Sequence, residues 1–437
     1  MLYIATDLEN KNWLVYLLEE LRRINGAEFD IEIIDADQKR EGNVLYYTKS
    51  FTGSPAIVNK SDVLLSSKTV KVSDDIFIVD GTQTDDSRFE EECDIFWNAF
   101  VFLSRLEEHV SVKQGRTINS YSFKHSRSDK ATFEVPVVNN LFNRLEMIIS
   151  KYFPDCRFHE GAKPIIELSH DVDYINKTLQ FRLRRFGLSV INSLKNIHKP
   201  KFFLKHISSG WKFLTANTSY WCFDYWQDLE KRLERKSIFY VYVKTKSRNI
   251  KNWLINPSYD ISRNIKLQKT LHALGKEGFQ IGLHGSYQSA VDREALAREK
   301  RILENILGHK VDRVRQHWLR YEEDVTPYVH NELFEYDSTL GWNDAIGFRS
   351  GCASRYKPYD HKAQKGFDFF ETPQVIMDGN IFDHDDDDRE EIIKRAFSLL
   401  ERLKRCKNAH AAISWHQRSS SADYQWHKVY EELANSI

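Results

Sequence analysis

Residues 163–173 read KPIIELSHDVD, a largely apolar run from Lys163 to Leu168 followed by Asp171 and Asp173. Such a run is typical of a buried parallel strand, and the two aspartates stand where it passes into a loop. Two carboxylates this close repel each other when both are ionised, so we expect one to bind a cation and the other to act as a base. The alternative is that one caps the next helix and the other is solvated.

Further apolar runs follow with helical stretches between them, at Ile238 to Val243, Phe279 to Leu283, Val311 to Arg315, Phe369 to Thr372 and His410 to Trp415. Strand alternating with helix predicts an α/β fold, either a parallel sheet or a closed (β/α) barrel. Ligands of such folds bind at the carboxyl ends of the strands, so the residues after each run are the ones to inspect.

Polar side chains occupy these strand ends. His284 lies in the run GLHGSY at 282–287, Arg315 and His317 in RQHW at 315–318, and His416 follows Trp415. Aspartate and imidazole ligands suit a divalent ion such as zinc in an open site. That chemistry predicts a hydrolase in which a carboxylate takes a proton from water and an imidazolium protonates the leaving group.

The first 160 residues predict a separate mixed α/β unit. We expect strands at Leu2 to Ala5, Ile31 to Ile34, Val44 to Tyr47 and Ile76 to Val79, and helices at Asn12 to Arg23, Ile95 to Leu106 and Val138 to Ile149. The predicted domains are therefore residues 1–160 and residues 161–437.

The composition argues against nucleic acid as a partner. The 437 residues contain 63 Lys plus Arg and 63 Asp plus Glu, so no overall positive charge attracts nucleic acid or an anionic membrane.

Five widely spaced cysteines form no CxxC pair, which favours free thiols over a disulfide framework. Residues 1–18 lack the basic and apolar regions of a secretory signal, so we expect a cytoplasmic location.

One segment departs from this neutral average. Residues 174–217 contain nine basic residues and no acidic one. This basic insertion predicts attraction to a phosphorylated or lipid-linked anionic substrate or to an anionic membrane surface. The alternative is an amphipathic hairpin that packs Phe181, Phe186, Leu188, Phe202 and Phe203 on the barrel and leaves its lysines in water.

The order of the motifs resembles polysaccharide deacetylases of the NodB-homology type (carbohydrate esterase family four), over about residues 163–420. The motifs are SHDVD at 169–173, IGLHGSY at 281–287, RQH at 315–317, GFRSG at 347–351 and WH at 415–416. This resemblance implies a distorted (β/α) barrel. The front portion, with LSRLEE at 103–108, looks like the α/β domain that precedes the barrel in a cytoplasmic, surface-polysaccharide-associated branch.

Carried over residue by residue, the resemblance implies that Asp171 is the base, Asp173 and His284 are metal ligands, and Arg315 orients Asp171. It makes His416 the acid that protonates the leaving group. Residues expected beside the site, next to the ligands or the substrate, are His170, Ser286, Gln288, Asp378 and Arg349.

The chain departs from the family's second motif, H-[ST]-x-x-H, because Gln288 stands four residues after His284. Gln288 could bind through its carbonyl, His317 could supply the missing imidazole, or the site could have lost its tight metal. We favour His317, since imidazole is the better zinc ligand.

The leading hypothesis is a metal-dependent hydrolase that removes an N-acetyl group from a sugar of a surface polysaccharide or its precursor. The alternatives are a catalytically impaired carbohydrate-binding or assembly protein of the same fold, and a hydrolase acting on a non-carbohydrate amide.

Overall fold

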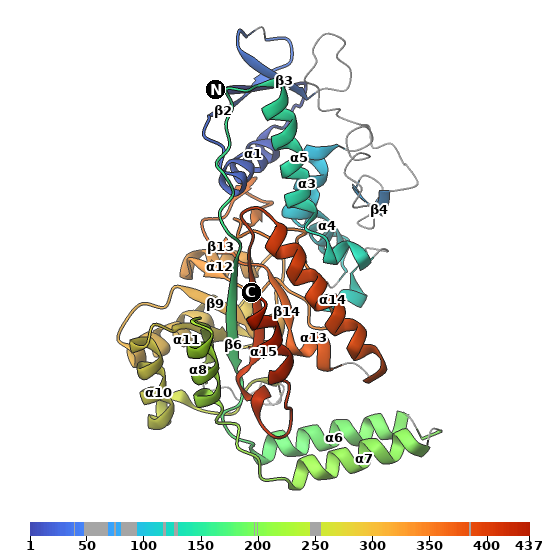
Figure 1. Cartoon of the computed structure of the whole chain (residues 1–437), viewed down its shortest axis with the longest axis vertical. Helices are drawn as coiled ribbons and strands as arrows, with labels where there is room; N and C mark the ends of the chain where they lie inside the picture. The colour runs from blue at the N-terminus through green and yellow to red at the C-terminus, as the bar shows by residue number, and fades with distance from the viewer. Residues whose placement is uncertain are drawn as a thin grey trace. The chain divides into compact units, whose positions relative to one another are not determined.

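The computed structural model describes residues 1–38, 40–47, 69–73, 76–79, 94–116, 119–125, 130–195, 197–198, 200–244, 255–383 and 386–437 (Figure 1). The chain forms two compact units. The first contains Met1–Glu167 and Leu319–Ile413, and the second contains Leu168–Trp318 and Ser414–Ile437. Residues 319–413 thus group with the front of the chain, and a domain boundary near residue 160 stays a prediction.

The first unit begins with a parallel sheet in the order β2-β1-β3. Its strands are β1 (Leu2–Thr6), β2 (Ile31–Asp35) and β3 (Asn43–Tyr47), and helix α1 (Asn12–Asn25) connects β1 to β2. These elements agree with the prediction within two residues. The helix ends at Gly26, which adopts the left-handed conformation (φ 68°) that glycine accepts without strain.

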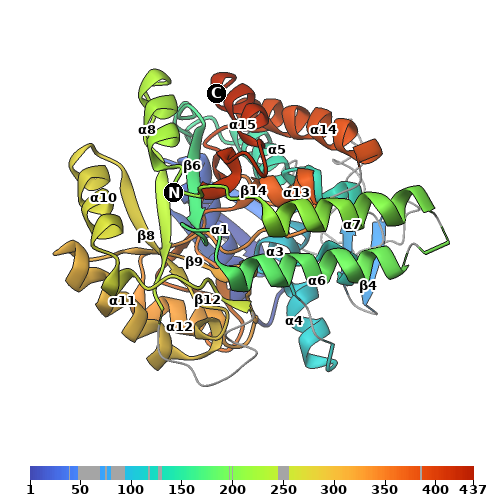
Figure 2. The same ribbon diagram turned by 90° about the horizontal axis from the view of Figure 1, so that it is seen from below.

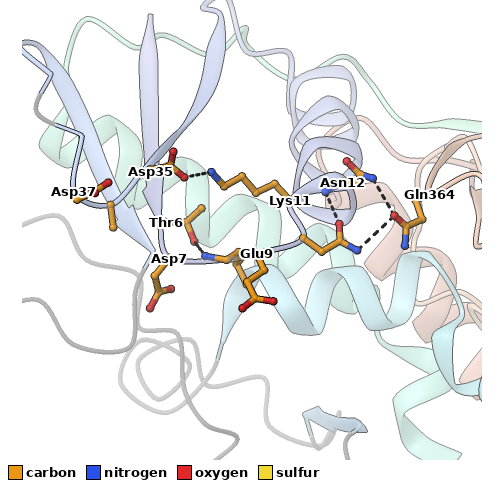
Figure 3. A pocket seen from close by; sticks show the side chains of 11 residues that line it. Thr6, Asp7, Glu9, Lys11, Asn12, Asp35, Asp37 and Gln364 are labelled. Atoms are coloured by element: carbon orange, nitrogen blue, oxygen red, sulfur yellow. Dashed lines mark hydrogen bonds and ion pairs between the residues drawn. The ribbon is translucent and has the colours of Figure 1, made fainter.

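An open pocket of about 930 Å³ lies at the carboxyl ends of β1 and β2, where α1 begins (Figure 3). Lys11 forms an ion pair with Asp35 across it. The Asn12 side chain donates a hydrogen bond to Gln364 Oε1 over 2.9 Å. The pocket is therefore polar, and Asp7 and Glu9 on its rim are exposed.

A predicted helix over 95–106 is two helices, α3 (Ile95–Leu103) and α4 (Leu106–Lys113). Arg105 lies between them in a left-handed conformation (φ 52°), which interrupts the helical hydrogen bonds. Helix α5 (Val137–Tyr152) packs on α3, and their buried faces share one aromatic-rich core with α1. This part of the first unit is held by apolar packing.

The remaining elements of the first unit are η2 (Ser122–Lys124), η3 (Lys130–Glu134), α12 (Thr326–Leu333), α13 (Asp378–Phe382) and α14 (Asp386–Arg405), with β4 (Thr69–Ser73), β5 (Ile76–Val79), β10 (Tyr336–Asp337), β11 (Tyr359–Asp360), β12 (Lys365–Gly366), β13 (Phe370–Glu371) and β14 (Gln374–Met377). Strands β10 and β13 pair in parallel, which gives the predicted strand near residue 370 a partner.

The second unit is built on strands in the order β9-β8-β7-β6-β15. These are β6 (Ile165–Val172), β7 (Ile238–Tyr242), β8 (Gln280–Gly285), β9 (Arg313–Gln316) and β15 (His410–His416). Pairs β6/β7, β7/β8 and β8/β9 are parallel, and every residue of β7 is buried. The protein is therefore mixed α/β with a parallel sheet, and the last strand neighbours β6 as expected.

Helices α8 (Phe223–Arg232), α10 (Ile265–Lys276) and α11 (Arg293–Leu307) connect these strands, and α15 (His427–Asn435) follows the last of them. The short turns are η4 (Ile261–Arg263), η5 (Ser289–Val291), η6 (His317–Leu319) and η7 (Gln417–Ser420). The basic insertion forms α6 (Leu179–Lys195) and α7 (Pro200–Thr215). These two helices lie side by side as an antiparallel hairpin in both views (Figures 1 and 2).

Candidate metal centre

The candidate site lies at the carboxyl edge of the second unit's sheet. Side chains alternate along a strand, so Ser169, Asp171 and Asp173 share one face at the end of β6. His284 on β8, Arg315 on β9, His317 just after β9 and His416 at the end of β15 reach the same edge. The structure therefore brings together the six residues predicted to be catalytic or metal-binding.

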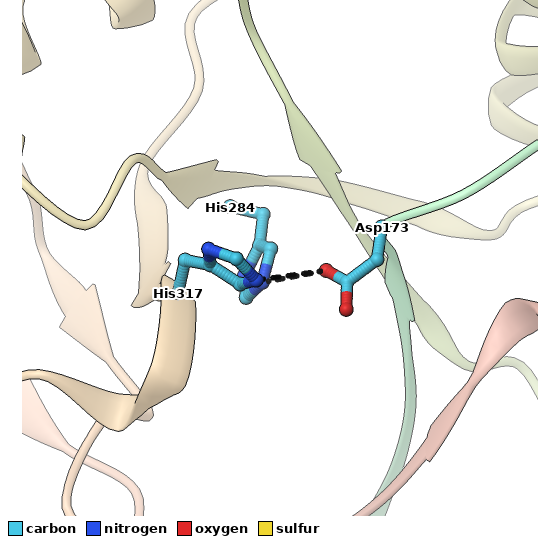
Figure 4. Close-up of side chains that lie close together, drawn as sticks. All are labelled: Asp173, His284 and His317. Carbon is cyan, nitrogen blue, oxygen red and sulfur yellow. Dashed lines mark ion pairs between the residues drawn. The ribbon is translucent and has the colours of Figure 1, made fainter. Parts of the chain in front are cut away.

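Asp173, His284 and His317 form a buried three-residue group whose ligand atoms lie within 4.8 Å of one another. His284 Nε2 is 3.2 Å from Asp173 Oδ1, and His317 Nε2 is 3.8 Å from the same oxygen. Figure 4 shows the two imidazoles facing this carboxylate. One carboxylate and two imidazoles are a donor set that could hold a divalent metal ion.

The partners of the two imidazoles fix which nitrogen faces Asp173. His284 Nδ1 is 3.0 Å from the backbone carbonyl of Arg315, and His317 Nδ1 is 3.4 Å from Asn256 Oδ1. Both partners are acceptors, so Nδ1 carries the hydrogen in each ring and Nε2 presents a lone pair. Asp173 Oδ1 is a buried oxygen without a hydrogen-bond partner. The Nε2 lone pairs of both rings face this oxygen, and a cation could bind between the three atoms.

The electrostatics agree with that fit. Burial lowers the pKa of His317 to about 3, so its imidazole is neutral at pH 7. Burial acts to raise the pKa of Asp173, but the contacts with His317, His284 and His416 outweigh it and hold the pKa well below its usual range. A neutral imidazole and an ionised carboxylate are the states that bind metal.

Asp171 forms a second buried pair beside this group. Arg315 Nη1 donates to Asp171 Oδ1 over 2.8 Å, and it also lies within 2.9 Å of the hydroxyl oxygens of Ser169 and Ser414. Burial favours the protonated carboxyl, but Arg315, followed by His284 and His416, lowers the pKa of Asp171. Asp171 is therefore an ionised carboxylate held in place by a buried guanidinium.

His416 contacts the other side of Asp173. Its Nε2 lies 3.2 Å from Asp173 Oδ2, and Arg418 Nη1 donates to the same oxygen over 3.1 Å. The side chain of His416 is 18% exposed, against 2% for His284 and 7% for His317. His416 is thus the imidazole of this site that solvent reaches best.

The predicted neighbours of the site have other partners. Gln288 Oε1 accepts a hydrogen bond from the Asn256 side chain over 2.6 Å. The backbone N–H of Ser286 donates to Glu299 Oε2 over 3.0 Å. His170 points to the opposite side of β6, where its Nε2 lies 2.7 Å from Glu230 Oε1. These three residues support the loops and strand of the site from outside the Asp173 group.

The expectation that Arg349 and Asp378 lie beside the site stays a prediction. Both residues belong to the first unit. The Arg349 guanidinium forms two hydrogen bonds with Glu108, of 2.9 and 2.8 Å. The Asp378 carboxylate accepts a hydrogen bond from the backbone of Gly379 at the start of α13.

Sequence reasoning missed Asn256 and Arg418. Asn256 is buried in the loop after β7, and it contacts His317, Gln288 and the backbone of Tyr287. No strand-end pattern marks its position. Arg418 follows His416 by two residues, and its position after a strand ending in histidine was the signal that could have identified it.

Comparison with sequence families covers the front of the chain. A family model described as a family of unknown function, DUF7033, matches residues 2–154. No protein with a curated function matches the chain in sequence.

Comparison with solved structures gives polysaccharide deacetylases of carbohydrate esterase family four. An inferred polysaccharide deacetylase from Mycobacterium smegmatis has 14% identity and a TM-score of 0.37, over 63% of this chain and 87% of its own. A polysaccharide deacetylase from Bacillus cereus has 10% identity and a TM-score of 0.28, over 62% and 85%. A family-four pseudoenzyme from Bacillus anthracis has 10% identity and a TM-score of 0.27, over 64% and 63%. The neighbours thus include both enzymes and a pseudoenzyme.

Proposed function

We propose that the protein is a metal-dependent hydrolase of the polysaccharide deacetylase type that removes an N-acetyl group from a sugar of a surface polysaccharide or its precursor. The observation that carries this proposal is the buried Asp173, His284 and His317 group beside the Asp171–Arg315 pair. The motif order of the sequence supports the same reading. We propose a distorted barrel as the fold of the catalytic region and the cytoplasm as its compartment, which free buried cysteines such as Cys352 and Cys406 support.

Asp173, His284 and His317 would hold the metal ion, which we propose to be zinc. When bound, zinc polarises a carbonyl and lowers the pKa of a coordinated water toward about 7. The hydrogen bonds of His284 and His317 through Nδ1 keep their Nε2 lone pairs directed to one point. These hydrogen bonds would therefore orient the two imidazole ligands even in the absence of a metal ion.

Asp171 is the proposed general base. Arg315 keeps it ionised, so it can accept the proton that water loses as it attacks the acetyl carbonyl. The hydroxyls of Ser169 and Ser414 contact the same guanidinium nitrogen and hold it in place. The carboxylate is thereby fixed in both charge and orientation.

His416 is the proposed general acid. An amide anion is a very poor leaving group, so the departing sugar nitrogen needs a proton, which an imidazolium can give. The Nε2 atom of His416 lies 3.2 Å from Asp173 Oδ2, beside the proposed metal ligands. Because it is more exposed than His284 and His317, it can face a substrate that enters from solvent.

A second candidate function is a catalytically impaired carbohydrate-binding or assembly protein of the same fold. Gln288 motivates it, because this residue replaces the second imidazole of the family motif and its amide oxygen is engaged by Asn256. Against it, a binding protein has no need of a base, an arginine that orients the base and an acid in one place. A hydrolase for a non-carbohydrate amide would keep all three.

The test is acetate release from N-acetylglucosamine oligomers and from nucleotide-linked N-acetylated sugars by zinc-loaded protein. Asp171→Asn is the matched control, because it preserves the shape of the carboxyl and removes the base. We expect release by the wild type and loss in the control. Glycan binding by both proteins without release by either supports the second candidate, and release only from acetylated peptides supports the third.

A further inference from the structure

The hairpin α6/α7 belongs to the second unit and extends away from its strands (Figures 1 and 2). Each helix has 16 or 17 residues, so at 1.5 Å per residue the hairpin is about 25 Å long. Leu179, its first helical residue, follows Asp173 of the metal group by six positions. The hairpin therefore begins beside the proposed catalytic site.

Small residues form the contact between the two helices. A Cβ atom placed on Gly210 would lie 2.6 Å from Ser189 Cβ, and the Ser193 hydroxyl lies 3.4 Å from the backbone carbonyl of Phe203 on the facing helix. Aromatic side chains also meet across this contact, since the Phe181 and Phe213 rings lie 5.6 Å apart and the Phe186 and Trp211 rings 6.3 Å apart.

Exposed apolar side chains concentrate on the hairpin. Of the sixteen exposed large hydrophobic residues in the described part of the chain, seven lie between 179 and 211. They are Leu179 (67% exposed), Leu183 (54%), Ile191 (50%), Leu194 (58%), Ile197 (64%), Leu204 (63%) and Trp211 (60%). Leu179, Leu183 and Leu194 are spaced to share one face of α6, Leu204 and Trp211 share one face of α7, and Ile197 lies in the connection between the helices. None of these seven is among the residues that the alternative expected to pack on the barrel; of those, Phe181 is buried against Tyr174 and Tyr220.

The charge around this apolar surface is positive. Arg185, Lys201 and Lys212 are exposed, and residues 174–217 contain no acidic side chain. Lys177 does not contribute, because it is buried 2.7 Å from Asp423 Oδ2. The hairpin thus exposes apolar side chains next to cations that no acid of its own segment neutralises.

We propose that α6 and α7 bind an anionic membrane surface, lying in its interfacial plane with the seven apolar side chains inserted. An amphipathic helix with apolar and basic residues binds in this way, by burial of apolar area and attraction to anionic lipid. Among the described residues, no helix is both long and apolar enough to cross a bilayer. The positive charge of the hairpin favours an anionic membrane over a second copy of the hairpin as its partner, because a second copy carries the same positive charge and would be repelled.

Flotation of the full protein with lipid vesicles tests this proposal independently of catalysis. Vesicles of phosphatidylcholine alone are compared with vesicles containing about a third phosphatidylserine, at about 0.1 M and about 1 M salt, where the screening length falls from roughly 10 Å to roughly 3 Å. We expect binding to the anionic vesicles at low salt, weaker binding at high salt, and little binding to phosphatidylcholine.

Two hairpin variants and two matched controls separate the contributions. Lys201→Glu/Lys212→Glu should weaken binding about 25-fold or more, since each basic residue contributes about fivefold near an anionic surface. Leu204→Ser/Trp211→Ser should abolish flotation. The controls Lys269→Glu/Lys276→Glu and Ile265→Ser change exposed residues of α10 and should bind as the wild type.

No binding to any vesicle, equal binding to both lipid compositions, or equal loss in the controls would overturn the proposal. Self-association through the hairpin, seen by light scattering without vesicle binding, would also overturn it.

Discussion

His416 Nε2 lies 3.2 Å from Asp173 Oδ2, whereas His284 Nε2 lies 3.2 Å from Oδ1 of the same carboxylate. The two histidines thus contact different oxygens of Asp173, and the oxygen next to His416 also accepts a hydrogen bond from Arg418. His317 faces the oxygen that His284 faces. This arrangement separates a group suited to hold a metal from an imidazole suited to move a proton.

The first prediction follows for His416. We expect His416→Ala to retain the metal content of the wild type and to lower kcat on the order of 10²-fold or more, the usual contribution of a positioned proton donor. Elemental analysis and acetate release measure the two effects. Metal loss in this variant would show that His416 is a ligand, and unchanged turnover would remove it from the mechanism.

The second prediction concerns the third ligand. The wild type should bind a near-stoichiometric divalent metal, and His317→Ala and His284→Ala should each lose it, because each removes an imidazole from a three-residue group. Gln288→Ala should keep its metal, since its side chain contacts Asn256. Elemental analysis after purification without chelator distinguishes these variants. Full metal in His317→Ala with loss in Gln288→Ala would reverse the assignment.

The third prediction tests the buried pair of Asp171 and Arg315. Arg315→Met should lower the free energy of unfolding by about 3–5 kcal/mol, because it leaves the buried Asp171 carboxylate without its partner. Asp171→Asn/Arg315→Met should recover much of that loss, since no unpaired charge remains. Urea unfolding of the two variants measures this difference. If the double variant is no more stable than the single one, the charge pair is not the cause.

Much of the fold could be predicted from the sequence, because hydrophobic periodicity and composition are local properties of the chain. The strands at β6, β7, β8, β9 and β15 all fall within four residues of their expected limits. The break between α3 and α4 at Arg105 was not predicted, because a non-glycine residue in the left-handed conformation does not change the apolar pattern of the sequence. The strand-end rule then brought Asp173, His284 and His317 together correctly, because parallel strands end at one edge.

Residues on loops were harder to assign. Asn256 contacts His317 from the loop after β7, and that contact depends on a path of the chain that no periodicity specifies. Lys177 looked like one of nine equivalent cations, but its pairing with Asp423 joins positions far apart in the sequence. In each case tertiary contacts decided the role.

Glu299 on α11 provides the last prediction, a dependence of stability on pH. Its side chain is fully buried; Oε2 accepts the backbone N–H of Ser286 over 3.0 Å, and Oε1 has no hydrogen-bond partner. Burial raises the pKa of this carboxyl from 4.5 to about 7, although hydrogen bonds from Ser286 act against the shift. The carboxyl is therefore protonated in the folded protein at a pH where it is ionised in the unfolded chain.

The sign of the effect follows from proton binding. Between the unfolded pKa near 4.5 and the folded pKa near 7, the folded state holds the extra proton, so the free energy of unfolding falls as pH rises, by at most about 1.4 kcal/mol per pH unit. Above about pH 7 the contribution of this group is constant. Glu299→Gln removes the titration, so the variant should gain stability relative to the wild type from about pH 5 to about pH 7. Urea unfolding at several pH values measures it, with the exposed Glu294→Gln on the same helix as control. Wild-type and Glu299→Gln stabilities that stay parallel over this range would show that Glu299 is ionised in the folded protein.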